Sequence, residues 1–261
     1  CLSRGLGDVY KRQYLHTKAP PDHQQIVVEP FTLYFHPPDT GPDANYALPN
    51  VPLQPLSPFV LDQLQAVFIA RQRTPTIKYL DAVAPDLEAS LLVAGFREAQ
   101  RWQVMVCTRD MVVPPVLPGD VELSTLSAES SLEEIRAGLD VNALGFDLQA
   151  ARATDAEAEQ FRKTLVDSRA FGLRYAGQSV SGGMFIDIHD RVTELAGITT
   201  LQPYRRRGLA GVVTAWMTQA AFDHGADLVF LIVANELAGR VYARVGFQPC
   251  AVLLEWRAGA V

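Results

Sequence analysis

The chain has 261 residues, of which 48% are hydrophobic, and 23 Lys and Arg against 29 Asp and Glu give a net charge of −6. This length allows one large or two small domains with a sizeable core. The acidic balance argues against nucleic-acid binding, which needs a basic surface, and no apolar run is long enough to span a membrane. Three cysteines without metal-ligand spacing, Cys1, Cys107 and Cys250, favour a reducing cytoplasm over a disulfide framework.

The first thirteen residues are set apart from the rest. Asp8 to Gln13 reads DVYKRQ, which the transposon mosaic end of sequencing libraries encodes when it is translated. We therefore interpret Cys1 to Gln13 as translated adapter and leave them out of the reasoning about the fold. This interpretation implies that the native start of the chain is missing.

Residues 14–110 are predicted to form a first α/β region. Two short strands are expected within 24–36, and a loop rich in Pro and Asp follows over 37–58, with one short strand near Tyr46. Beyond that loop the pattern predicts a helix over 61–71, a strand over 76–80, a helix over 85–93 and a strand over 102–107. Residues 111–119 contain Pro114, Pro115 and Pro118 and are predicted to be a linker.

Residues 120–261 are predicted to form a second domain. A strand over 121–126 precedes two helices, over 131–139 and 155–169, and the first helix starts with a capping-box pattern of Ser131 and Glu134. An antiparallel meander is expected over 171–176, 178–188 and 192–201, with turns at Gly177 and at His189-Asp190.

A loop with the pattern R-x-x-G-x-A follows this meander. It consists of Arg205, Gly208 and Ala210, and it lies between the strand-like run 194–201 and a helix-like run over 209–224. Gly208 allows a sharp turn, and the amides after it are the unpaired donors of a helix N-terminus. Such a turn can bind phosphate. The alternative interpretation is three solvated Arg side chains at an ordinary helix start.

A second motif lies downstream in the sequence NELAGRVYARVGF. Asn235 suits the N-cap of a helix, Tyr242 lies two turns along the same face, and Gly246 ends the helix. The apolar run 228–233 before it is typical of a buried parallel strand. A core tyrosine on an amphipathic helix is the alternative interpretation of Tyr242.

Together the two motifs resemble the GNAT superfamily of N-acetyltransferases. The R/Q-x-x-G-x-G/A loop of that family matches the Arg205 loop, and its N-x-x-A-x-x-x-Y-x-x-x-G-F helix matches Asn235 to Phe247. One departure is Gln202, where the family usually has Pro. The resemblance spans about 118–256 and implies an α/β fold of the α+β type with a mixed sheet, the GNAT acyl-CoA N-acyltransferase fold.

The first region repeats part of this pattern. If Gly95-Phe96 is aligned with Gly246-Phe247, Ala84 stands at the position of Asn235 and Leu91 at that of Tyr242. We therefore interpret residues 14–110 as a degenerate GNAT-like half without ligand chemistry, although helix-Gly-Phe-strand is also a common local pattern.

The resemblance implies acetyl-CoA as a co-substrate and no metal. The amides from Arg206 to Gly211 would hold its pyrophosphate, and the edge of the preceding strand would pair with its pantetheine arm. The residues expected to bind it are Ile198, Thr199, Thr200, Arg205, Arg206, Arg207, Gly208, Leu209, Ala210, Gly211, Asn235 and Tyr242.

Acyl transfer to an amine also needs a base and a group that assists the leaving thiolate. The family places a tyrosine at the position of Tyr242, which makes it the candidate general acid. An amine is mostly ammonium near neutral pH, so a base is required. Glu194 is the candidate, with Asp187 and His189 as alternatives.

The predicted reaction is direct transfer of an acetyl group from acetyl-CoA to a primary amine in a ternary complex. We expect a small-molecule acceptor rather than a protein tail, because no acidic run suggests a groove for a lysine peptide. Two rivals are a noncatalytic acyl-CoA sensor or scaffold, and an acyltransferase for a longer chain or a non-amine acceptor. The sequence does not indicate the oligomeric state.

Overall fold

The computed structural model describes residues 23–50, 53, 56–165 and 169–259. The interpretation of Cys1 to Gln13 as adapter therefore falls outside the described residues. The chain divides into two compact units, which we call unit 1 (residues 1–104 and 250–261) and unit 2 (residues 105–249). The strands β5 and β11 each contribute residues to both.

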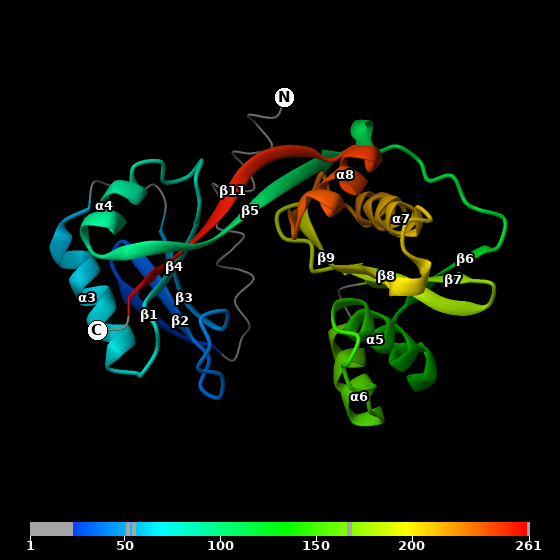
Figure 1. Ribbon diagram of the computed structural model, residues 1–261, viewed down its shortest axis with the longest axis horizontal. Helices are drawn as coiled ribbons and strands as arrows, with labels where there is room; N and C mark the ends of the chain where they lie inside the picture. The colour runs from blue at the N-terminus through cyan, green and yellow to red at the C-terminus, as the bar shows by residue number, and fades with distance from the viewer. Residues whose placement is uncertain (1–22, 51–52, 54–55, 166–168, 260–261) are drawn as a thin grey trace. The chain divides into compact units, whose positions relative to one another are not determined.

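Unit 1 is an α/β unit whose strands follow the order β1-β2-β3-β4-β11-β5 (Figure 1). β1, β2 and β3 pair antiparallel, and β3 pairs parallel with β4. Its elements are β1 (Gln24–Val28), β2 (Phe31–Phe35), β3 (Asn45–Pro49), α3 (Pro58–Ile69), β4 (Thr76–Leu80), α4 (Leu87–Val93), β5 (Phe96–Thr108) and β11 (Gln248–Ala258).

The core of unit 1 lies between its sheet and its two helices. Leu64 and Phe68 of α3 and Leu91 of α4 are fully buried, and they pack with Ile77 and Trp256 of the sheet. This packing explains why the periodic apolar residues of both segments form helices, as the sequence predicts.

Unit 2 carries the motifs singled out in the sequence. Its strands follow the order β5-β10-β9-β8-β7-β6, with α5 and α6 on one face of the sheet and α7 and α8 on the other (Figure 1). Its further elements are β6 (Val121–Leu126), α5 (Leu132–Phe146), α6 (Asp155–Thr164), β7 (Arg169–Tyr175), β8 (Gln178–Phe185), β9 (Val192–Thr200), α7 (Leu209–Asp223), β10 (Leu228–Val233) and α8 (Glu236–Val245).

The two helices before the meander differ in length from the prediction. α5 runs on to Phe146, because Val141 in its later turns is buried and Asn142 bonds to the backbone of β9. α6 ends at Thr164, and Arg169 begins β7 instead of ending a helix. The predicted capping box is present, since Ser131 accepts from the Glu134 amide and Glu134 accepts from the Ser131 amide.

The compact units divide the chain differently from the predicted domains. Residues 250–261 belong to unit 1, because β11 pairs antiparallel with β4 from Leu253↔Leu80 to Arg257↔Thr76. The predicted linker is irregular from 112 to 118 but belongs to unit 2, where the Val113 amide donates to the Val245 carbonyl at 2.9 Å.

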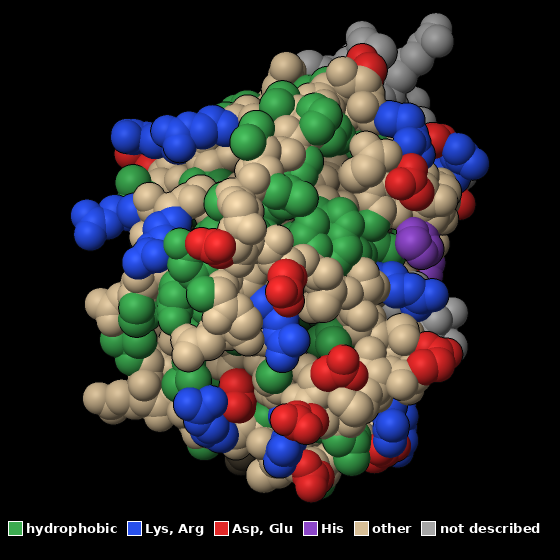
Figure 2. Space-filling view, turned by 90° about the vertical axis from the view of Figure 1, so that its right-hand side faces the viewer, with side chains coloured by type: hydrophobic (Ala, Val, Ile, Leu, Met, Phe, Trp, Pro, Cys, Tyr) green, Lys and Arg blue, Asp and Glu red, His purple; other side chains and the backbone are tan. Residues whose placement is uncertain are grey.

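Acidic and basic side chains are interspersed on the face shown in Figure 2, with hydrophobic side chains gathered between them. Among the described residues, none of the helices has the length and apolar character needed to cross a membrane.

Candidate functional site

The two parallel strands at the centre of unit 2 separate part-way along their length. β9 and β10 pair over three positions, ending at Phe230↔Glu194. β9 then continues to Thr200 and β10 to Val233, and within these described strands no further pairing joins them. The edge of β9 that faces β10 is therefore open beyond Glu194, which leaves a place for an extended ligand with amide groups.

The predicted phosphate loop connects the end of β9 to α7. Gly208 is the N-cap of α7 with φ of +79°, and a Cβ placed there would meet nothing within 4 Å. Because the N-cap is a glycine, it has no side chain to cap the amides of Leu209, Ala210 and Gly211. The loop thus combines free space with donors and the positive end of a helix dipole, an arrangement suited to an anion.

The arginines of the loop have separate contacts. Arg205 donates from Nε to the Thr200 carbonyl at 2.9 Å and from Nη2 to the Gly145 carbonyl at 2.7 Å, so it joins the end of β9 to the end of α5. The Arg207 guanidinium lies 5.4 Å from the Tyr175 ring centroid and 5.6 Å from that of Tyr204. Two of the three arginines therefore order the loop through contacts within the protein.

Arg206 occupies the remaining arginine position of the loop. Its φ is +62°, in the left-handed region, and its side chain is exposed. A non-glycine residue in this region marks a sharp local turn. The turn directs the chain from β9 into α7, and it leaves the Arg206 side chain accessible to a ligand.

Helix α8 follows β10 and carries the second motif. Asn235 is its N-cap, and its Oδ1 accepts from the Ala238 amide at 3.1 Å, as the sequence predicts. The helix lies against the first turn of α7, since a Cβ at Gly211 would be 3.7 Å from Val241 Cγ1. The two motifs are therefore neighbours in space.

Tyr242 on this helix is 8% exposed and belongs to the core between α7, α8 and the sheet. Burial raises the pKa of its phenol to about 12. The side chain is therefore protonated throughout the neutral range and can donate a hydrogen bond. Its core position agrees with the simpler interpretation of this residue.

Of the other predicted residues of β9, Glu194, Thr199 and Thr200 are buried and Ile198 is partly buried. Glu194 is 4% exposed and lies at the last paired position. Side chains two residues apart share a face of a strand, so Glu194 is on the same face as Ala196. Ser181 Oγ donates to the Thr199 carbonyl at 2.6 Å and is 2.9 Å from Thr200 Oγ1. Ile198 packs against the core of unit 2.

The alternative bases lie at the far end of the meander. Asp187 and His189 are exposed in the connection between β8 and β9, and His189 exchanges backbone hydrogen bonds with Val192. This connection precedes the paired part of β9, whereas the phosphate loop follows its other end. The arrangement therefore favours Glu194 over these two residues.

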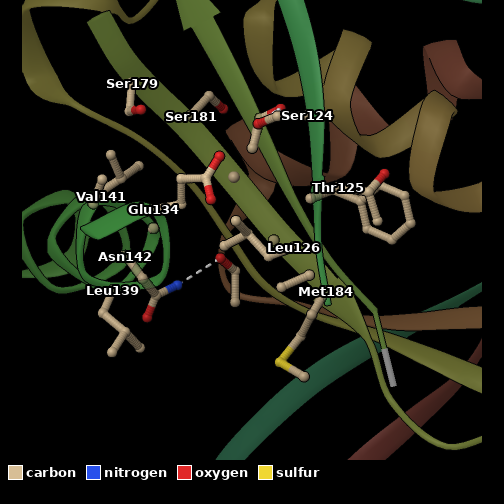
Figure 3. Close-up of a pocket in the computed structure, with 18 of the residues that line it drawn as sticks. Ser124, Thr125, Leu126, Glu134, Leu139, Val141, Asn142, Ser179, Ser181 and Met184 are labelled. Atoms are coloured by element: carbon tan, nitrogen blue, oxygen red, sulfur yellow. Dashed lines mark hydrogen bonds between the residues drawn. The ribbon is translucent and has the colours of Figure 1, made fainter. Parts of the chain in front are cut away.

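A pocket of about 190 Å³ lies between α5, α6 and the strands β6 to β9. Figure 3 shows Ser124, Ser179 and Ser181 on one side of it and Leu126, Leu139 and Met184 on the other. Ala196 and Gly197 of β9 form part of its wall, where Asn142 Nδ2 donates to the Gly197 carbonyl at 2.7 Å. The pocket thus reaches β9, whose edge towards β10 is open beyond Glu194.

The residues of this pocket were not predicted from the sequence. The helices that cover it carry no recognisable motif, and its polar residues come from separate elements. One usable signal was the run Ser181-Gly182-Gly183 in β8, because small residues on a strand leave space above the sheet.

Comparison with known proteins assigns the fold. Residues 182–255 match the family described as FR47-like protein. The chain is similar to the solved structure of a GCN5-related N-acetyltransferase from Kribbella flavida, with a TM-score of 0.75 and 24% identity, over 100% of this chain and 95% of that one. The chain has the GNAT fold.

Further comparisons agree with a GNAT fold over both halves. A tandem GNAT protein from the clavulanic acid biosynthesis pathway covers 93% of this chain and 86% of its own, with a TM-score of 0.67 and 17% identity. A GCN5-related N-acetyltransferase from Sphaerobacter thermophilus matches with a TM-score of 0.63 and 14% identity, over 88% of this chain and 80% of that one. Comparison with curated proteins finds no match. The predicted GNAT fold class is confirmed, and the match to a tandem GNAT protein fits the predicted GNAT-like first half.

Proposed function

We propose that unit 2 transfers an acetyl group from acetyl-CoA to a primary amine, by direct attack in a ternary complex. The observation that carries this proposal is the separation of β9 from β10 after Glu194, with the Gly208 loop following β9 and the helix of Tyr242 following β10. It supplies an open strand edge for the pantetheine arm and a helix N-terminus for the pyrophosphate.

The residues present fit this co-substrate. The amides from Leu209 to Gly211 would donate to its phosphates, and the open space at Gly208 allows close approach. Arg206 is exposed and would add charge, whereas Arg205 and Arg207 would act mainly by ordering the loop. The β9 edge at Ile198, Thr199 and Thr200 would pair with the amides of the arm.

The chemistry then requires a neutral amine. Glu194 would accept a proton from the ammonium form, through a water molecule, and the free amine would attack the thioester carbonyl. A carbon–nitrogen bond forms, the nitrogen loses its second proton to solvent, the carbon–sulfur bond breaks, and the thiolate leaves. Holding both reactants on one strand would supply much of the rate enhancement.

Tyr242 would assist the leaving thiolate. Its pKa is about 12, whereas a thiol has a pKa of about 8.5, so complete proton transfer from the phenol to the thiolate costs about 5 kcal/mol. We therefore assign Tyr242 as a hydrogen-bond donor that stabilises the thiolate, with the final proton coming from solvent. This role requires only a protonated phenol close to the sulfur.

We further propose a small-molecule acceptor and no nucleic-acid partner. A pocket of about 190 Å³ suits a small molecule, and the net charge of −6 disfavours phosphate backbones. The free, buried thiol of Cys107 is consistent with a reducing cytoplasm.

Calorimetric titration with acetyl-CoA tests the proposal, with wild type beside Gly208→Glu. A carboxylate at Gly208 should block the phosphate cradle by volume and by charge. Gly225→Glu is a matched control, because Gly225 also has positive φ (+102°) and free space around its Cβ position but lies after the other end of α7. Binding that is lost only in Gly208→Glu supports the proposal.

Absence of binding to folded wild type would refute the proposed function. Binding without turnover of any amine, unaffected by Tyr242→Phe, would instead favour the noncatalytic sensor.

A further inference from the structure

The pocket of unit 2 changes in character along the strands. Cross-strand register places Leu126, Ala170, Met184 and Ala196 in one apolar row. The next row contains Ser124, Gly172 and Gly182, and the row beyond it contains Arg174 and Ser179. The pocket therefore runs from an apolar end, next to the reacting part of β9, to a polar end.

A single cation lines the polar end. Among the described residues that line the pocket, Arg174 is the only Lys or Arg, and its side chain is exposed. In the described part of the chain it forms no ion pair, not even with its cross-strand neighbour Glu122. A planar guanidinium with free donors is suited to a carboxylate.

Among the described residues that line the pocket, Glu134 is the only one with a carboxylate. Glu134 extends from α5 towards the strands of Ser124 and Ser181 (Figure 3). Its Oε2 accepts from the amide and the hydroxyl of Ser131, at 2.9 and 2.8 Å. The other oxygen remains available to an ammonium group. Opposite charges at one end of a pocket favour a ligand that carries both.

The spacing separates this charged end from the site of acyl transfer. Arg174 and Ala170 are four residues apart on β7, about 13 Å along the strand, and Ala170 lies two strands from Ala196, about 10 Å across the sheet. Even when the reach of an arginine side chain is subtracted, an α-amine and its own carboxylate are too close together to span this gap. The reacting amine must therefore be distant from the charged groups.

We propose that this pocket binds an α-amino acid with a distal primary amine. Its carboxylate contacts Arg174, its α-ammonium contacts Glu134, and its distal amine reaches Ala196 and Gly197 as the acetyl acceptor. The alkyl chain between them passes the apolar row of Leu126 and Met184. This inference rests on the proposed function and adds the class of acceptor.

Three matched acceptors test the inference by calorimetric binding to the full chain in the presence of coenzyme A. Lysine carries all three groups, cadaverine lacks the carboxylate, and 6-aminohexanoate lacks the α-ammonium. We expect lysine to bind more tightly than either, by about 10- to 100-fold for each charged group that the other ligand lacks. Lysine within Gly-Lys-Gly has neither free charge next to its side chain and is expected to bind more weakly than either cadaverine or 6-aminohexanoate.

Two variants assign the preference to individual residues. Arg174→Met should lower the affinity for lysine to that for cadaverine and leave the affinity for cadaverine unchanged. Arg101→Met in unit 1 is the control. Glu134→Gln should lower the affinity for lysine to that for 6-aminohexanoate. Glutamine at this position preserves the capping box. Glu157→Gln is its matched control, because Thr154 and Glu157 form the same capping box on α6.

The outcomes separate this inference from the proposed function. Equal affinity for lysine and cadaverine, or binding of none of the amines, overturns the inference, and so does tight binding of Gly-Lys-Gly. Acetylation of cadaverine with no preference for lysine would leave the proposed function standing while the inference fails. Absence of acetyl-CoA binding to folded wild type would refute the proposed function, regardless of which amine the pocket binds.

Discussion

The side-chain amide of Asn142 on α5 donates to the backbone carbonyl of Gly197 on β9, at 2.7 Å. Gly197 has φ of +64°, and a Cβ at this position would lie 2.9 Å from the Asn142 nitrogen. The helix that covers the pocket is therefore fixed to the strand at an irregular point, where the acyl group and the amine are proposed to meet.

Replacement of Asn142 by Ala should slow acetyl transfer more than it weakens the binding of acetyl-CoA. Loss of one hydrogen bond costs about 1 kcal/mol of stability, and misplacement of the reacting strand by about 1 Å can reduce kcat by about 100-fold. Steady-state kinetics with calorimetry for acetyl-CoA measures both effects. Asn50→Ala in unit 1 is the control, and equal kcat in the two variants would contradict the positioning role.

A second contact between α5 and β9 depends on the absence of a side chain at Gly145. A Cβ there would lie 1.9 Å from Thr199 Oγ1, so Gly145→Ala requires the helix to move. We expect a loss of about 1–3 kcal/mol in the free energy of unfolding. Gly138→Ala on the same helix meets only the end of the Leu126 side chain, at 2.8 Å, and should cost less. Urea denaturation of both variants tests the ranking, and the opposite order would show that α5 is not held closely against β9.

Arg205 links the same helix to the phosphate loop. Its guanidinium bridges the Thr200 and Gly145 carbonyls, a geometry that a lysine ammonium does not reproduce. Arg205→Lys preserves the charge but should lower both thermal stability and affinity for acetyl-CoA, the affinity by about 5- to 10-fold. Arg206→Lys should leave both nearly unchanged. If Arg205→Lys keeps full affinity, the side chain acts through its charge alone.

The order of elements in unit 2 was predictable because its signals are local. Asn235 caps α8 and Ser131 caps α5 as expected, since capping depends on a few adjacent residues. The end of α6 was not predictable: Arg169 continues the helical pattern of the sequence but pairs with Phe185 in the sheet. Pairing between distant strands overrides local preference here.

The site was only partly predictable for the same reason. The loop at Gly208 and the helix of Tyr242 each form one continuous motif, which a sequence displays. The pocket brings together Glu134 from α5, Arg174 from β7 and Gly197 from β9, and their proximity follows from the register of the strands. The hydrogen bonds of Arg205 to backbone carbonyls could not be predicted either, because the sequence indicates its charge but not its partners.

Tyr242→Phe separates the two roles of this phenol. If the hydroxyl stabilises the leaving thiolate, kcat should fall by about 100-fold or more, while the KM for acetyl-CoA changes little. An unchanged kcat would mean that Tyr242 serves only as a core residue. Because its pKa is about 12, the phenol remains protonated well above pH 10, so titration of Tyr242 should not limit the activity of wild type between pH 7 and 10.

The same substitution should alter the stability of the protein in alkaline solution. Burial raises the pKa of Tyr242 from 10.0 to about 12, so the folded state holds the phenolic proton more tightly than the unfolded state. This contribution is complete below pH 10 and is lost as the pH rises from 10 to about 12, at up to about 1.4 kcal/mol per pH unit. Wild type should therefore lose more stability than Tyr242→Phe between pH 9 and pH 11, as measured by urea denaturation. Equal losses would mean that the phenol is solvated in the folded protein, and a solvated phenol would be a stronger acid than the one assigned to the site.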